Sequence, residues 1–308
     1  MTTRRMTLAA CASRAGGMKR HPHFWPLLAA LFGVACLSVM DAAMKGAALA
    51  IGAYSASVLR SGFAATLAMP VWLLRGGRWP APPVLRLHLL RGTVSAVMAF
   101  SFFYALTKLP IAEAIAISFV APLLALYLAK VLLGETIAPK AVWGSLIGFA
   151  GTVVIVSGRL GAVTADTETV KGLAALLFSA TLYAWNFIII RQQALVAGPL
   201  EATAFHGGVG FLLFAPALPF AFTMPDPHTA LLLLSAGILT VAASLAITWA
   251  YARAEAQVLV PIEYSSFAWA SALGWVFFAE SVRATTLAGT VLIVAGCWIA
   301  VRQQSVAA

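Results

Sequence analysis

The sequence predicts an all-α integral membrane protein with ten transmembrane helices in two inverted five-helix repeats. Three observations predict this fold: the composition, ten long apolar segments, and a duplication at a spacing of 145 residues. Hydrophobic residues make up 62% of the 308 residues, charged residues 10%, and the mean hydropathy is +0.94. Soluble domains carry about 25% charged residues. This chain therefore has too little charge to cover a water-facing surface.

Ten segments of the chain are long enough to cross a membrane. A spanning helix needs about 20 mostly apolar residues. Helices are expected rather than strands because the segments are long and lack strict apolar–polar alternation. The predicted spans are 24–44, 53–74, 87–107, 111–132, 139–157, 172–191, 200–221, 229–251, 257–279 and 284–302.

These spans divide the chain into two halves with short flanking segments. The first half is 24–157, the second half is 172–302, and the loop 158–171 joins them. A basic N-terminal tail, 1–23, for which disorder is one interpretation, and a C-terminal tail, 303–308, complete the chain. A cleaved signal peptide is the competing interpretation of the N-terminal tail and the span after it. Met18 is an alternative start, so it stays open whether residues 1–17 belong to the native protein.

The duplication is clearest in the last two spans of each half. The stretch 111–151 is echoed by 257–296, and at an offset of 145, residues 112–151 align on 257–296 without a gap, with Glu135 on Glu280. Glycines align in the same register, Gly144 on Gly289 and Gly151 on Gly296. Five spans per half is an odd number, so the two halves must enter the membrane in opposite senses. Weaker matches at offsets of 145 and 146 pair Asp41 with Asn186 and Arg60 with His206.

The basic residues predict the orientation of the chain. With the N-terminus in the cytoplasm, fourteen Lys and Arg residues lie on the cytoplasmic side and five on the far side. This bias places both termini in the cytoplasm. The net charge of +10 does not indicate a nucleic-acid partner, because the bases lie between apolar spans. Cys11, Cys36 and Cys297 lie far apart, so we expect neither a disulfide nor a metal site.

The motifs of the two halves resemble a known family. Pro122, the run LLGE ending at Glu135, and the two glycines after it resemble the drug/metabolite transporter superfamily, EamA type. The second half matches through Ala279-Glu280 and its glycines, but has Phe267 where the first half has Pro122. The resemblance covers 24–302. It implies a bacterial inner-membrane transporter without a cofactor, whose central cavity is lined by the third and fourth helices of each half, here 87–132 and 229–279.

Charged side chains inside spans are costly and are functional candidates. Glu263 lies near the middle of its span, where it could bind a cationic group or exchange a proton; a protonated, hydrogen-bonded glutamate is the alternative. Arg60 could hold a carboxylate or phosphate, or form an ion pair with Asp41 or Glu263. Asp41, four residues before Lys45, is either an interfacial partner of that lysine or part of a gate or cavity.

Other polar and aromatic residues on the spans could either contact a substrate or have a purely structural role. His206 and Asn186 are more typical of hydrogen bonds between helices than of ligand contacts. Aromatic residues could stack on a substrate or pack in the core. We expect the following residues to supply several positions of the cavity wall: Arg60, Ser118, Phe119, His206, Trp249, Glu263 and Tyr264.

Two further sets of residues have a structural interpretation. Glu135 and Glu280 each end a span, and we expect them to cap the helix that follows. Gly144, Gly148 and Gly151, with Gly289 and Gly296 in the second half, predict close helix packing, either inside the monomer or in a homodimer.

The sequence predicts a transporter rather than an enzyme, since it holds no catalytic or ATP-binding motif. The expected function is secondary transport of small organic metabolites (amino acid-like, vitamin-like or drug-like), by export through proton antiport or exchange. The alternatives are an uptake carrier of the same family, a lipid-linked flippase or lipid-modifying protein, and a scaffold without cargo. The expected partners are a small-molecule substrate and the lipid bilayer.

Overall fold

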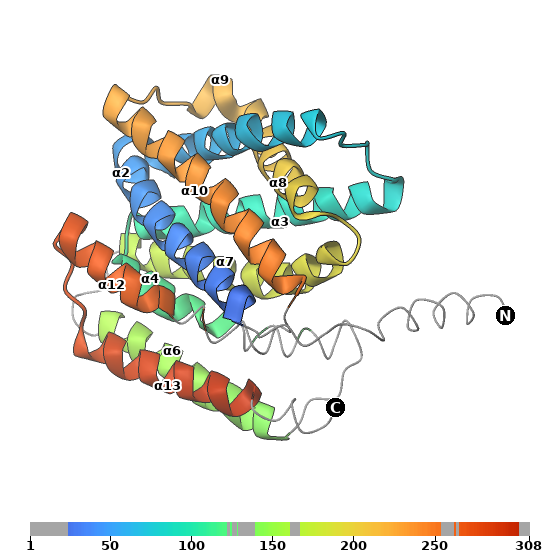
Figure 1. Ribbon diagram of the computed structural model, residues 1–308. Helices are drawn as coiled ribbons and strands as arrows, with labels where there is room; N and C mark the ends of the chain where they lie inside the picture. The colour runs from blue at the N-terminus through green and yellow to red at the C-terminus, as the bar shows by residue number, and fades with distance from the viewer. Residues whose placement is uncertain are drawn as a thin grey trace, which may run out of the picture.

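The computed structural model describes residues 24–121, 139–160, 167–253 and 265–301, together with Leu124, Leu128 and Ile262. Over these residues the chain forms helices joined by short connections (Figure 1). Prolines begin several helices, because their fixed φ suits the first turn and no N–H bond is lost there. The elements are α2 (Phe24–Leu74), α3 (Pro82–Leu106), α4 (Ile111–Ser118), α6 (Pro139–Leu160), α7 (Thr167–Ala194), α8 (Pro199–Phe214), η2 (Ala215–Ala217), α9 (Leu218–Ala221), α10 (Pro227–Tyr251), α12 (Ser265–Phe278) and α13 (Ala284–Val301).

The first helix, α2, consists of two arms that meet at Gly52. The backbone there has φ 82° and ψ 152°, while the residues on both sides are helical. A residue with a side chain rarely adopts such a positive φ, whereas glycine does so without strain. The sequence predicted two spans separated by a connection between residues 44 and 53. In the structure the helix continues to Ile51, and Gly52 alone makes the turn.

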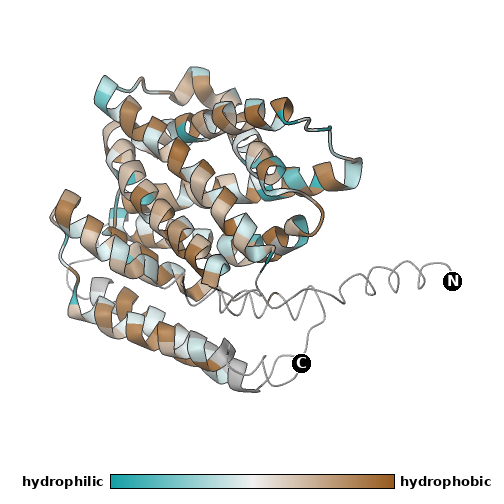
Figure 2. Cartoon of the chain, in the orientation of Figure 1, coloured by the Kyte–Doolittle hydropathy of each residue, from teal (hydrophilic) through white to brown (hydrophobic). Residues whose placement is uncertain are grey.

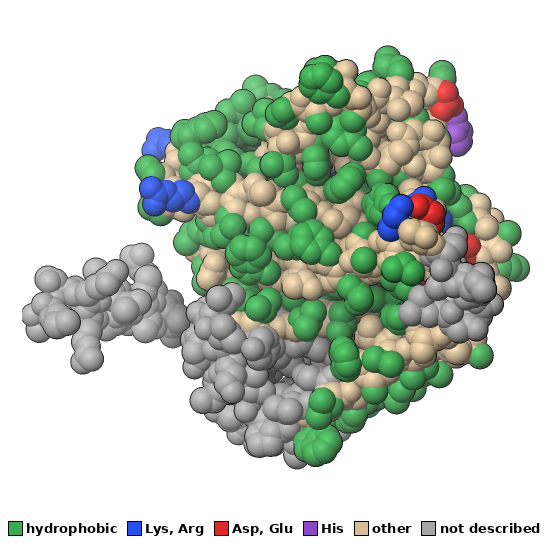
Figure 3. Space-filling view, turned by 180° about the vertical axis from the view of Figure 1, so that it is seen from behind, with side chains coloured by type: hydrophobic (Ala, Val, Ile, Leu, Met, Phe, Trp, Pro, Cys, Tyr) green, Lys and Arg blue, Asp and Glu red, His purple; other side chains and the backbone are tan. Residues whose placement is uncertain are grey.

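The outer surface of the bundle is apolar. In the described part of the chain, five helices are long and apolar enough to cross a membrane: α2, α3, α7, α10 and the segment Pro199–Ala221. Shorter apolar helices lie at Leu146–Gly158, Ser265–Phe278 and Ala284–Gly296. Figure 2 shows apolar residues along all the helices, and on the face drawn in Figure 3 apolar side chains are spread widely while charged ones gather in a few places. Such a surface suits lipid rather than water, so the chain is a multi-pass membrane protein.

The helices form a main bundle and a separate helix pair. In the bundle, α10 packs along α2, α8 packs against α2 and α3, and α3 packs against α7. The pair is α6 with α13, and α4 and α12 lie between it and the bundle (Figure 1). The largest fully buried side chains include Met44, Phe103, Ile117, Leu176 and Leu233. The core therefore runs through both halves of the sequence.

Several helix boundaries differ from the sequence prediction. Helix α6 extends to Leu160 and α7 begins at Thr167, so part of the predicted loop 158–171 is helical. An ion pair of 2.9 Å between Glu168 and Lys171, three residues apart, supports the first turn of α7. The predicted span 200–221 is broken near Pro216, where a 3₁₀ turn interrupts the helical path.

Glycines bring α6 and α13 into backbone contact. A Cβ added at Gly151 would lie 2.5 Å from the Gly289 carbonyl oxygen, and one added at Gly296 would lie 2.4 Å from that of Gly144. One at Gly158 would lie 2.5 Å from Thr285 Oγ1. Residue numbers thus rise along α6 as they fall along α13, so the two helices run antiparallel. The predicted glycine face does pack within the monomer.

We expect Gly151→Ala to destabilise the protein by about 1–3 kcal/mol, because the new methyl group would overlap the α13 backbone. The thermal unfolding midpoint of the purified protein in detergent measures this. Gly46→Ala is the matched control, since its Cβ would lie an ordinary 3.7 Å from Leu232 Cδ1. A Gly151→Ala protein as stable as the Gly46→Ala protein would contradict the close crossing.

Candidate functional site

A cluster of buried polar side chains lies where α2, α3 and α8 meet. We call it the central cluster: Asp41, Arg60, Arg91 and His206. Arg60 is 5% exposed and Arg91 7%, while Asp41 and His206 are partly buried. Asp41 acts electrostatically on Arg60, and both arginines act on His206. The structure therefore joins three sequence-predicted residues with Arg91, which the sequence did not single out.

The arginines of the central cluster bind neutral partners. Arg60 Nη1 donates to Thr240 Oγ1 at 3.2 Å, and its guanidinium carbon lies 5.4 Å from the centre of the Phe103 ring. Arg91 Nη1 donates to Gln193 Oε1. In the described part of the chain no carboxylate comes within 4 Å of the Arg60 guanidinium, so the alternative of an Arg60–Asp41 ion pair is not realised. A buried charge without an opposite charge in contact is costly.

A hydrogen-bonded chain leads from Arg91 toward one end of the bundle. Gln193 Nε2 lies 2.6 Å from His88 Nδ1, and His88 Nε2 lies 2.8 Å from Glu201 Oε1. The His88 ring stacks on Phe205, with 4.5 Å between ring centres. The sequence did not indicate these residues, because each lies near the end of its span, where polar groups are ordinary. The spacing of His88 and Arg91, one turn apart on α3, is the signal that could have shown them.

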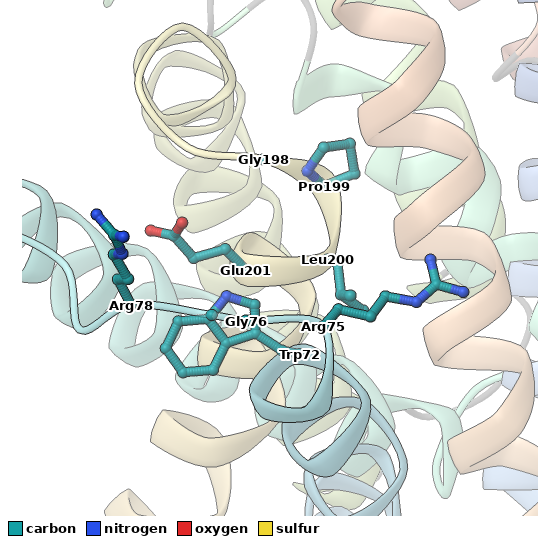
Figure 4. Close-up of a pocket in the computed structure, with 9 residues that line it drawn as sticks. Trp72, Arg75, Gly76, Arg78, Gly198, Pro199, Leu200 and Glu201 are labelled. Carbon is teal, nitrogen blue, oxygen red and sulfur yellow. The ribbon is translucent and has the colours of Figure 1, made fainter.

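A surface pocket of about 400 Å³ lies at this end, which we call the His88 end. It lies between the loop after α2 and the loop before α8, so both halves line it. In Figure 4 the Glu201 side chain extends toward Arg78, while Arg75 points the other way. Because Glu201 lines the pocket and also contacts His88, the polar chain from Arg91 reaches this surface. The lining residues are Trp72, Arg75, Gly76, Gly77, Arg78, Gly198, Pro199, Leu200 and Glu201.

At the other end of α3, which we call the Lys45 end, an ion pair joins the two halves. Lys45 Nζ pairs with Glu280 Oε1 and also donates to the Leu109 carbonyl oxygen at 2.8 Å. The second carboxylate oxygen of Glu280 accepts the Ile111 N–H at 2.9 Å. The sequence predicted that Glu280 caps the helix after it, α13. Glu280 instead caps α4, because the chain turns at Ala279 (φ 52°) and α13 begins only at Ala284.

A second ion pair joins the halves at the Lys45 end. Glu113 is 3% exposed, and its Oε1 lies 3.8 Å from Arg283 Nε. Arg283 Nη1 also donates to the Gly158 carbonyl oxygen at 3.3 Å. A cavity of about 230 Å³ borders Lys45 and Glu280. The Lys45 end is thus fastened by two charge pairs between the halves.

The remaining predicted residues have varied surroundings. Asn186 is 4% exposed and its Oδ1 accepts a hydrogen bond from Ser95 at 3.1 Å, as its structural alternative predicted. Ser118 donates to the Ala114 carbonyl oxygen at 2.9 Å, and Phe119 lies in the apolar core. The Trp249 ring centre lies 4.2 Å from the Arg253 guanidinium carbon. Glu135, Glu263 and Tyr264 lie outside the described residues.

Comparisons with known proteins agree on a transporter family. The model of the EamA-like transporter family matches residues 24–157 and 170–302. A pseudopaline exporter of Pseudomonas aeruginosa is 26% identical over 272 residues, covering 88% of this chain and 94% of that protein. A riboflavin transporter of Brucella anthropi is 26% identical over 248 residues, covering 79% of this chain and 85% of that protein. One crystal structure shares the fold, with a TM-score of 0.62 at 23% identity over 88% of this chain and 96% of the other.

We expect Lys45→Met to destabilise the protein by about 3–5 kcal/mol, because it leaves the Glu280 carboxylate without its cation in a largely buried place. The double variant Lys45→Met/Glu280→Gln should recover part of that loss. Thermal unfolding of the purified proteins measures both. Lys171→Met is the control: its partner Glu168 is exposed, so the unfolding midpoint should stay unchanged. Additive losses in the double variant would contradict coupling between Lys45 and Glu280.

Proposed function

We propose that this chain, which belongs to the EamA-like transporter family, is a secondary transporter of small organic metabolites that works by alternating access in the bacterial inner membrane. The family consists of transporters rather than enzymes. Relatives named as a pseudopaline exporter and a riboflavin transporter support a metabolite as cargo. Amino acid-like, vitamin-like and drug-like compounds are the substrate classes we propose. The proposed direction is export by proton antiport or exchange, and uptake is the alternative.

The two ends of the bundle are joined in different ways, and this difference supports the proposal. Each end borders a pocket, but among the described residues full Lys/Arg–Glu pairs join the halves only at the Lys45 end, and hydrogen bonds among Arg91, Gln193, His88 and Glu201 join them at the other. At the Lys45 end, the pairs Lys45–Glu280 and Glu113–Arg283 fasten the halves together. At the His88 end, the halves border a pocket that a polar chain links to the central cluster. A carrier with alternating access closes one end while the other gives access to a site midway between them. We assign the Lys45 end to the outside, where the Lys and Arg bias of the sequence puts it.

The glycine contacts of α6 and α13 support the inverted repeat of ten spans. Gly144 contacts Gly296, and a shift of 145 residues turns this pair into Gly289 with Gly151, which is the second contact found. Each contact is therefore converted into the other when the two helices are interchanged. Two antiparallel helices with this property are related by a two-fold axis that passes through the point where they cross. An axis in the membrane plane has this effect, and it relates the proposed halves 24–157 and 172–302.

We assign substrate binding to the central cluster and the spans around it. Arg60, His206 and Asp41 supply its charged and polar groups, and Asn186 lies on the neighbouring α7. Ser118, Phe119, Tyr264 and Trp249 lie on segments that the family resemblance assigns to the cavity wall. Glu263 is the proposed coupling residue, on the sequence argument that a mid-span carboxylate has two protonation states.

If the Lys45 end must open during transport, a cross-link there should stop it. We expect a short bis-maleimide linker between Lys45→Cys and Glu280→Cys, in a cysteine-free chain, to reduce exchange at least tenfold. Counterflow in proteoliposomes, with radiolabelled tryptophan and riboflavin as probes, measures exchange. Glu168→Cys/Lys171→Cys is the control, because it links two residues of one helix. Undiminished exchange with the Lys45 end linked would count against alternating access.

We expect Glu263→Gln to abolish accumulation driven by a pH gradient while leaving substrate exchange intact. An ionised carboxylate at mid-span costs about 2.5–3.5 kcal/mol on insertion scales, so a proton or a substrate must neutralise it. The amide removes the proton-carrying state but keeps the shape and polarity. Uptake into proteoliposomes with an imposed pH gradient measures the effect. Gradient-driven transport at the wild-type rate would exclude Glu263 from coupling.

A further inference from the structure

Three buried nitrogen atoms of the central cluster lack hydrogen-bond partners. They are Arg60 Nε on α2, Arg91 Nε on α3 and His206 Nδ1 on α8. Both arginines are more than nine-tenths buried. Buried polar groups in proteins are nearly always hydrogen-bonded, so each exception calls for an explanation. Three such exceptions on neighbouring helices indicate that a ligand completes the site.

Glycine contacts bring the three helices together beside these residues. A Cβ added at Gly210 on α8 would lie 3.1 Å from Ser61 Oγ on α2 and 3.8 Å from Ala96 Cβ on α3. One added at Gly92 on α3 would lie 2.5 Å from Val209 Cβ on α8. Arg60 and Arg91 immediately precede Ser61 and Gly92 in the sequence. The unpartnered donors therefore belong to a closely packed junction.

The charges of the cluster do not balance among the described residues. Arg60 and Arg91 remain positive because a guanidinium does not lose its proton in proteins. Their direct side-chain partners, Thr240 and Gln193, are neutral. Asp41 is the single acidic group in the described part of the chain that acts on Arg60. Among the described residues, the central cluster thus carries more positive than negative charge, in an apolar bundle where charges are weakly screened.

We infer that Arg60, Arg91 and His206 bind the carboxylate or phosphate group of an anionic organic substrate. The inference rests on the proposed transport function, because it names the class of cargo for the same site. Guanidinium groups match the geometry of oxyanions and bind them through two parallel hydrogen bonds. The imidazole of His206, with its proton on Nδ1, donates a third. The anion supplies the missing negative charge and accepts from all three unpartnered nitrogens.

The hydrogen-bonded chain at the His88 end links this site to a surface pocket. The pocket there is lined by Arg75, Arg78 and Glu201, with Glu201 extending toward Arg78 and Arg75 pointing the other way (Figure 4), so its charged side chains sum to one positive charge that favours an anion. Gln193 and His88 then lead inward to Arg91. A neutral analogue of the same shape lacks this attraction and leaves both guanidinium charges unbalanced. The site should therefore select the anion over its neutral counterpart.

Matched compounds test the inference on the purified full-length protein. The pairs are succinate with succinamide, 3-phenylpropionate with its amide, and phenyl phosphate with phenol. We expect at least one anion to raise the thermal unfolding midpoint, and its neutral partner to need at least tenfold higher concentration for the same rise. The anion that stabilises the protein then shows whether the site prefers a carboxylate or a phosphate group. Equal stabilisation by anions and neutral partners, or by neither, would overturn the inference.

Variants locate the binding. Arg60→Gln and Arg91→Gln should each weaken stabilisation by the anion at least tenfold, and Arg60→Lys should restore part of it by returning the charge without the planar fork. Lys171→Gln, at an exposed position on α7, should bind as the wild type does. Unchanged binding in both glutamine variants overturns the inference. The wild-type comparison of anion and neutral partner needs no variant, so it holds even where a variant does not fold.

Counterflow of the same compounds separates this inference from the proposed function. Exchange of neutral compounds without any exchange of anions would overturn the anion site and leave transport standing. Binding of anions through Arg60 and Arg91, without exchange of any compound, would support the site and overturn transport.

Discussion

The cost of placing a full charge inside an apolar bundle governs this structure. Most of the outer surface is apolar, so the few charged side chains that enter the interior need partners within the protein. At the Lys45 end the buried charges are paired: Lys45 forms an ion pair with Glu280, and Glu113 forms one with Arg283. In the central cluster the pairing is incomplete among the described residues, where Arg60 and Arg91 have neutral partners and unpartnered nitrogens. Buried charges that are paired within the protein hold the two halves together. Buried charges without such a pair suit the binding of a substrate that arrives and leaves.

Close helix packing has a second physical basis, the absence of side chains at glycine. In a membrane, helices gain little from apolar burial against each other, so short distances between backbones matter more. Gly151 and Gly289 let α6 and α13 touch, and Gly207 on α8 would place a Cβ 2.8 Å from the Ala65 nitrogen on α2. Rigid contacts of this kind fix the positions of helices on both sides of the polar interior.

The sequence alone predicted the features that depend on composition and on the spacing of residues along the chain. It missed the features that depend on contacts between residues far apart in the sequence. The length of the apolar segments predicted a helical membrane protein. The spacing of the glycines predicted the close packing found between α6 and α13. The pairing of Lys45 with Glu280 could not be predicted, because those residues lie 235 positions apart and the local partner Asp41 was the simpler choice. Arg91, His88 and Glu201 were missed because a polar residue near a span end is ordinary until its neighbours are known. Gly52 was missed because one positive φ replaces a loop without any change in hydropathy.

Glu280 has two roles that depend on one carboxylate. One oxygen pairs with Lys45, and the other accepts the N–H of Ile111, the first residue of α4. Any movement that draws Glu280 away from Lys45 therefore also exposes the positive end of the α4 dipole. Withdrawal of Glu280 from the first half therefore breaks both interactions. Fraying of α4 would then accompany that withdrawal, and an ordered first turn of α4 would report that this end is shut.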